Sequence, residues 1–277
     1  MQRVRRRLGA LATRPVPAGQ ALRSHAESVS RDEAAYLDVC RLAPIDASVF
    51  ASFRRHPGYT RVLEHVSEEQ GHEYLRLLSA NGLARCHLAE AARNDTLGQP
   101  HTMRIEPGIE IAPTTLRYLK VADDIEQMFG GLDGATVVEI GVGYGGQCRV
   151  LDMLFALKSY TLVDLRPVLN LADEYLSHFP LRTTVQSLTM NELSARPYDF
   201  AVSNYALTEL SRDLQETYYR KVLQHASKGY ITYNNIGPAE YRPMTATELI
   251  DRLGGRSFPE EPLTHPHNQI IAWGTSA

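Results

Sequence analysis

The segment VVEIGVGYGGQCRVLD, at residues 137–152, constrains the fold of this chain more than any other. It passes from an apolar strand pattern into a turn with four glycines and then into a helical pattern. Glycine in such a turn lets the backbone approach a ligand closely, because a Cβ would collide with it. Amide groups that open the following helix favour a negatively charged part of the ligand. The segment therefore predicts a strand–turn–helix unit that binds a ligand.

Strand patterns alternate with helical patterns throughout the chain beyond residue 135. Repeated units of this kind imply a mostly parallel sheet that helices cover on both faces, which is an α/β, doubly wound fold. The predicted strands lie at 135–141, 160–165, 182–188, 198–204, 229–235 and 268–274.

The first third of the chain has a different pattern, with apolar residues at helical spacing from about 21 to 93. Within it, residues 57–82 predict one long helix, which begins at a Pro-Gly pair and ends at an Asn-Gly pair. Residues 94–113 are rich in turn formers and predict a loop with one short strand. The predicted regions are a flexible basic tail at 1–20, a helical cap that shapes the substrate site at 21–112, and a catalytic domain at 113–277.

Composition excludes several classes of protein. A net charge of −3 gives no support to a nucleic-acid binder, and no apolar run approaches the ~18 to 20 residues that cross a membrane. Three widely spaced cysteines favour reduced thiols in the cytoplasm over a disulfide framework or a zinc cluster. The Arg-rich start predicts a solvated tail, with an organelle transit peptide as the alternative. We expect a cytoplasmic protein whose partner is a small molecule. Composition does not decide between a monomer and a homodimer.

Two cofactors fit the glycine turn, namely NAD and S-adenosylmethionine. Glu139 directs a carboxylate toward the turn, where it would repel a pyrophosphate but could hold the α-ammonium group of S-adenosylmethionine. Asp164 ends the next strand and is placed to accept both ribose hydroxyls, which fits either cofactor. The last predicted strand follows without room for a separate substrate domain, which dehydrogenases usually have. These residues favour S-adenosylmethionine.

The motifs VVEIGVGYGG and LVDL resemble those of class I S-adenosylmethionine-dependent methyltransferases. In addition, NDTLGQP, APTTLRYLKV, EIGVGYGGQC, SNYALTEL and GYITYNNIG, in that order, resemble a bacterial family of sugar O-methyltransferases from about residue 50 onward. The resemblance implies a Rossmann-like methyltransferase sheet of seven strands, the last antiparallel, beside an N-terminal helical cap. It also implies cofactor contacts at Glu139, Gly141, Gly143 and Asp164, with Ser187 and Leu188 near the adenine.

Four more residues are predicted to contact the cofactor. Arg117 could hold the methionine carboxylate through its bidentate guanidinium group, although a place on the helix surface is the alternative. Its neighbour Tyr118 could assist it. Tyr144 lies inside the glycine turn and could pack over the cofactor, or simply be exposed. Asn204 follows the fourth strand and could orient hydroxyl groups, although Asn at strand ends also serves turns.

Methyl transfer to a hydroxyl group calls for a positioned base. Glu209 is the first candidate, because it follows Tyr205 by one helical turn and burial beside the cofactor would raise its pKa. The alternative is that Glu209 pairs with Arg212. His265 is the next candidate, and Tyr205 and Asn235 are expected to orient the acceptor. No metal is predicted, since the acidic residues do not cluster and a pair of histidines gives too few ligands.

These residues together predict an S-adenosylmethionine-dependent O-methyltransferase. Its expected acceptor is a hydroxyl group of a sugar or glycosylated small molecule, from natural-product or polysaccharide biosynthesis. Two alternatives are an NAD-dependent oxidoreductase on the same fold and an inactive methyltransferase-like module that only binds.

Overall fold

The structure is a computed structural model that describes residues 31–234, 236 and 239–275. The predicted basic tail and the predicted site residue Asn235 lie outside these ranges. Within them, no helix is long and apolar enough to cross a membrane.

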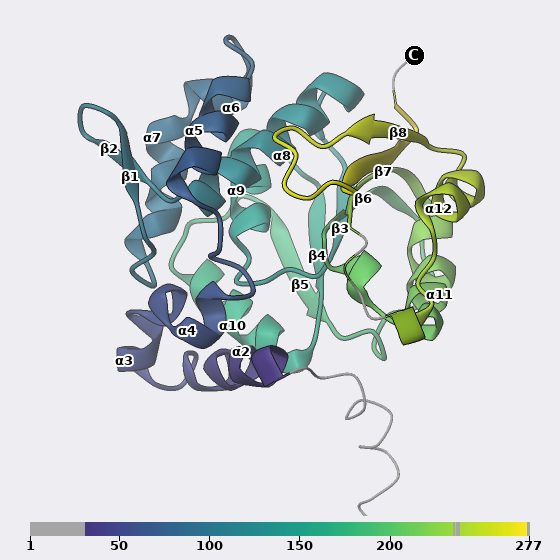
Figure 1. Cartoon of the computed structure of the whole chain (residues 1–277), viewed down its shortest axis with the longest axis horizontal. Helices are drawn as coiled ribbons and strands as arrows, with labels where there is room; N and C mark the ends of the chain where they lie inside the picture. The colour runs from purple at the N-terminus through teal and green to yellow at the C-terminus, as the bar shows by residue number, and fades with distance from the viewer. Residues whose placement is uncertain (1–30, 235, 237–238, 276–277) are drawn as a thin grey trace, which may run out of the picture.

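A seven-stranded sheet crosses the middle of the molecule in the order β5-β4-β3-β6-β7-β9-β8 (Figure 1). Its strands are β3 (Thr136–Ile140), β4 (Ser159–Val163), β5 (Thr184–Leu188), β6 (Tyr198–Asn204), β7 (Ala226–Tyr233), β8 (Arg256–Pro259) and β9 (Gln269–Trp273). Strands β3 to β7 are parallel, whereas β9 is antiparallel to both neighbours. This is a doubly wound, Rossmann-like sheet of seven strands whose last strand is antiparallel, as predicted. The alternation of patterns does not reveal β8, a short edge strand that ends in proline.

Helices cover both faces of this sheet (Figure 1). They are α8 (Pro113–Phe129), α9 (Gly146–Leu154), α10 (Arg166–Ser177), α11 (Arg212–Lys221) and α12 (Ala246–Leu253). Side chains alternate along a strand, so Val137 packs with α8 to α10 while the next residue, Val138, packs with α11 and α12. The N-terminal helices join the first of these cores, so the cap and the sheet share one hydrophobic cluster.

The N-terminal cap consists of short helices and a hairpin. Its elements are α2 (Arg31–Leu42), α3 (Ala47–Phe50), α4 (Pro57–Thr60), α5 (Glu68–Leu77), α6 (Leu83–Cys86), α7 (Leu88–Ala91), β1 (Met103–Glu106) and β2 (Ile109–Ile111). The prediction of one helix over 57–82 is wrong. Ser67 accepts a hydrogen bond from the Gln70 amide, and the Gln70 side chain accepts one from the Ser67 amide, so this capping box starts a new helix at Glu68. The single predicted strand is a two-stranded hairpin.

A buried ionic cluster fastens the cap to α8. Arg54 is fully buried, and its guanidinium group lies 2.5 Å from Glu64 Oε1 and 2.8 Å from Asp95 Oδ1. Asp95 also accepts hydrogen bonds from the amide of Ala112 and the hydroxyl of Thr115, at the start of α8. The cluster thereby joins the NDTLGQP and APTTLRYLKV motifs, and it fixes α8 beside α9 and the glycine turn.

Candidate active site

The glycine turn follows β3 at the edge of the sheet where the parallel strands end. Ligands of open α/β sheets bind at this edge. Gly141 and Gly143 have φ angles of +80° and +54°, which residues with a Cβ rarely adopt. A Cβ on Gly141 would lie 2.0 Å from the Cβ of Ala206, and one on Gly143 would lie 2.9 Å from Leu63 of the cap. Both glycines are therefore required by the backbone and by what packs against it.

Two acidic side chains lie beside this turn, as predicted. Glu139 is 2% exposed and accepts a hydrogen bond of 2.8 Å from the Tyr160 hydroxyl, and burial raises its pKa to about 8. The half-buried Asp164 accepts hydrogen bonds from the amides of Val142 and Leu165, and removal from water raises its pKa to about 6. Burial disfavours the charged form of both groups, and a cationic ligand would stabilise that charged form.

Arg117 is a buried cation at the same edge. Its guanidinium carbon lies 5.9 Å from the centre of the Tyr118 ring and 5.4 Å from that of Tyr205, and one nitrogen donates a hydrogen bond of 3.4 Å to the carbonyl of Leu63. Despite burial, the neighbouring tyrosines and Glu64 raise its pKa, so it is charged. A guanidinium group carries five N–H donors, so Arg117 can also hold an anionic group of a ligand.

The two tyrosines predicted as cofactor contacts lie in the core instead. Tyr144 is fully buried, its ring is 4.7 Å from that of Tyr175, and Arg54 lies 4.5 Å above it. Tyr118 is 6% exposed and packs against Gly146 behind the turn. We leave both out of the proposed cofactor site. The spacing of residues in a turn does not show to which side each side chain points.

The predicted adenine contacts have other neighbours. The Ser187 hydroxyl donates a hydrogen bond of 2.5 Å to Asp173, and Leu188 packs partly into the second core. Leu165, directly after Asp164, is an apolar side chain that is 42% exposed at this edge. It is suited to cover a planar base, and an apolar residue after the acidic strand end is the sequence signal that could have found it.

The predicted base Glu209 lies at the end of β6, in the 3-10 turn Leu207–Glu209. Asn234, at the end of β7, donates a hydrogen bond of 2.6 Å to its Oε1 atom. Arg212, the alternative partner, pairs with Glu248 and Glu216. The Glu209 side chain is exposed, so the burial on which the prediction depends is missing. The structure nevertheless fixes this carboxylate at the edge where the strands end.

Tyr205 follows β6 in a strained backbone conformation. Its φ is +66°, which is unusual for a residue with a bulky side chain and often marks a functional site. Its hydroxyl donates a hydrogen bond of 2.5 Å to Glu260, which is 5% exposed. Asn204 is held by Gln147 and Thr232 at 3.3 and 3.1 Å. No local pattern distinguishes Glu260, since only the tertiary structure brings it to Tyr205.

His265 and His267 lie in the connection into β9, and both are exposed, with ring centres 5.7 Å apart. Among the residues that the structure describes, no group of three or more His, Cys, Asp or Glu side chains is arranged to hold a metal ion.

No protein-family model matches this sequence, and no curated protein matches it. Similar solved structures include a magnesium protoporphyrin IX methyltransferase from Synechocystis PCC 6803 with bound S-adenosylhomocysteine, at 12% identity and a TM-score of 0.44 over 56% of this chain and 80% of that one. An S-adenosylmethionine-dependent methyltransferase from Mesorhizobium loti is 16% identical, with a TM-score of 0.41 over 54% and 94% of the two chains. An O-methyltransferase from neocarzinostatin biosynthesis is 15% identical, with a TM-score of 0.40 over 60% and 57%.

Proposed function

We propose that the protein transfers a methyl group from S-adenosylmethionine to a hydroxyl group of a sugar-containing small molecule. The observation that carries the proposal is the pair Glu139 and Asp164 beside the glycine turn. Burial raises the pKa of both carboxyl groups, which disfavours their charged forms. A cofactor with a cationic amino acid and a ribose complements them, whereas a pyrophosphate would be repelled.

The residues at this edge fit the parts of the cofactor. Glu139 would hold the α-ammonium group and Arg117 the carboxylate. Asp164 would accept the ribose hydroxyls through lone pairs that its backbone amide donors do not use, and Leu165 would cover the adenine. When bound, the cofactor supplies an electrophilic methyl group. The N-terminal cap, through Leu63, and α8, through Arg117, would shape the site and exclude water.

The groups that follow β6 and β7 would act on the acceptor. Glu209, oriented by Asn234, would take the proton of the acceptor hydroxyl as its oxygen attacks the methyl carbon. Tyr205 and Asn204, each held by hydrogen bonds, would position the acceptor. Holding the two reacting atoms close and collinear supplies much of the rate in such a displacement.

Ligand titration tests the cofactor assignment. We expect S-adenosylhomocysteine to bind the purified protein with a Kd in the micromolar range, about −8 kcal/mol, and NADH to show no saturable binding. Isothermal titration calorimetry with the two ligands in parallel measures both. Saturable binding of NADH alone would instead support an oxidoreductase.

The base assignment is tested by Glu209→Gln. We expect the affinity for S-adenosylhomocysteine to stay within about twofold of the wild type, while methylation falls at least ~100-fold, the usual scale for loss of a general base. The measurement is transfer of a labelled methyl group to nucleotide sugars and glycosides. Asp213→Asn, an exposed acidic residue on α11, is the matched control. Wild-type turnover by Glu209→Gln would remove Glu209 from this role.

A further inference from the structure

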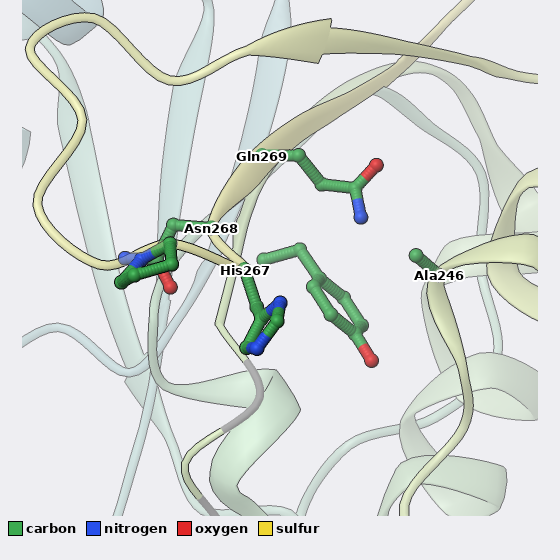
Figure 2. A pocket seen from close by; sticks show the side chains of 6 residues that line it. Ala246, His267, Asn268 and Gln269 are labelled. Carbon is green, nitrogen blue, oxygen red and sulfur yellow. The ribbon is translucent and has the colours of Figure 1, made fainter.

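A pocket of about 490 Å³ opens where β7 ends and β9 begins, next to the start of α12. Tyr233 and Gln269 are paired across the antiparallel strands β7 and β9, so their side chains lie on the same face. In Figure 2, Ala246 lies across the pocket from His267, with Gln269 between them on the strand side. The described residues that line it are Tyr233, Ala246, Pro266, His267, Asn268 and Gln269.

The pocket and the proposed base lie at the same edge of the sheet, since β6 and β7 are parallel and both end there. Asn234 directly follows Tyr233 of the pocket, and its amide group donates the hydrogen bond of 2.6 Å to Glu209. A ligand in the pocket would therefore lie at the same edge of the sheet as the carboxylate that is proposed to take the acceptor proton.

One wall of the pocket is held in place by a buried network. The Glu260 carboxylate accepts hydrogen bonds of 2.8 Å from both the amide and the hydroxyl of Thr264, besides the one from Tyr205. The Asn268 side chain donates to the Thr264 hydroxyl at 2.8 Å, and the Asn268 amide donates to the carbonyl of His265. The turn that carries His267 is thus fixed before any ligand binds, which lowers the entropic cost of binding.

The lining has a distinct chemistry. It contains an aromatic ring, an imidazole and side-chain amides, and no Asp, Glu, Lys or Arg among the described lining residues. The Oε1 atom of Gln269 accepts a hydrogen bond from Ser257, whereas its Nε2 atom has no partner among the described residues and can donate to a ligand. A mostly polar lining with one aromatic ring suits an uncharged polyhydroxylated ring, and a carboxylate or phosphate would find no lysine or arginine among the described lining residues.

We infer that this pocket binds an uncharged sugar ring of the acceptor, with Gln269 and His267 as its hydrogen-bonding groups. The inference rests on the proposed function. It adds where the acceptor binds and that the bound part of the acceptor is uncharged. It assigns to Glu260 the role of a positioning residue, which acts by holding the turn that bears His267.

Saturation-transfer NMR with methyl α-D-glucopyranoside and, in parallel, D-glucuronate tests this inference. With S-adenosylhomocysteine bound to the protein, we expect a saturation-transfer signal from the neutral glycoside. The signal from the uronate should be at least threefold smaller. His267→Ala should weaken the glycoside contact at least threefold, the scale of one lost hydrogen bond. Leu263→Ala, a 59% exposed residue of the same connection that does not line the pocket, is the matched control.

The outcomes separate the two proposals. Equal contact by glucuronate, no contact by the glycoside, or full contact with His267→Ala would each overturn the pocket assignment. Glycoside contact in a protein that does not bind S-adenosylhomocysteine would leave the pocket assignment standing and would overturn the methyltransferase proposal. Because His267 is exposed, its replacement tests binding without the risk of unfolding that a change at the buried Glu260 carries.

Discussion

Glu139→Gln is expected to weaken the binding of S-adenosylhomocysteine at least ~30-fold, since truncating one partner of a buried charge pair costs about 2–5 kcal/mol. The amide keeps the shape of the side chain but cannot balance the α-ammonium group. Isothermal titration calorimetry measures the change. Tyr160→Phe, which removes the hydrogen bond to Glu139 but keeps the carboxylate, is the control and should cost less than ~10-fold.

The same substitution should remove a pH dependence. Without ligand, the Glu139 pKa is about 8, so the carboxyl group is protonated at neutral pH and must lose its proton to hold a cation. Wild-type affinity is therefore expected to increase about tenfold per pH unit between about pH 6 and 7.5. Glu139→Gln should show no such slope. An equal slope in the variant would place the titrating group elsewhere.

The stability of the ligand-free protein is expected to change with pH in the opposite direction to the ligand affinity. The folded protein keeps the Glu139 proton at pH values where the unfolded chain has released it, so this group lowers the free energy of unfolding as pH rises from 4.5 to about 8. At pH 8, ligand-free Glu139→Gln is thus expected to melt at a higher temperature than the wild type. A lower melting temperature would mean that the carboxylate stabilises the fold rather than the ligand.

Arg54→Met is expected to lower the free energy of unfolding by about 3–5 kcal/mol, the cost of breaking a buried ion pair. The substitution keeps much of the side-chain volume but leaves Glu64 and Asp95 as buried carboxylates, 6% and 2% exposed, without their cation. Urea unfolding followed by circular dichroism measures the loss.

Arg55→Met is the matched control for this prediction, because Arg55 is the neighbouring residue and is exposed. It should change the free energy of unfolding by less than ~0.5 kcal/mol, as most surface substitutions do. If the two variants were equally stable, the cluster would not be what fastens the cap to α8.

The sequence determines the sheet and one edge of the site. Alternating strand and helix patterns predict the parallel strands, and the glycines predict the turn after β3, because the backbone there needs positive φ angles. Glu139 and Asp164 are predicted beside that turn because parallel strands end at the same edge. These inferences depend on local periodicity and on residues close in sequence. Both can be read directly from a single amino-acid sequence.

Only the tertiary structure decides which side chains reach that edge. Tyr144 lies inside the glycine turn and is nevertheless core, whereas Glu260 is 55 residues from Tyr205 and accepts its hydrogen bond. The break at Ser67 follows from a capping box that competes with a continuous helical pattern. Side-chain direction and long-range hydrogen bonds depend on how cap and sheet pack together, and spacing along one chain carries no information about that packing.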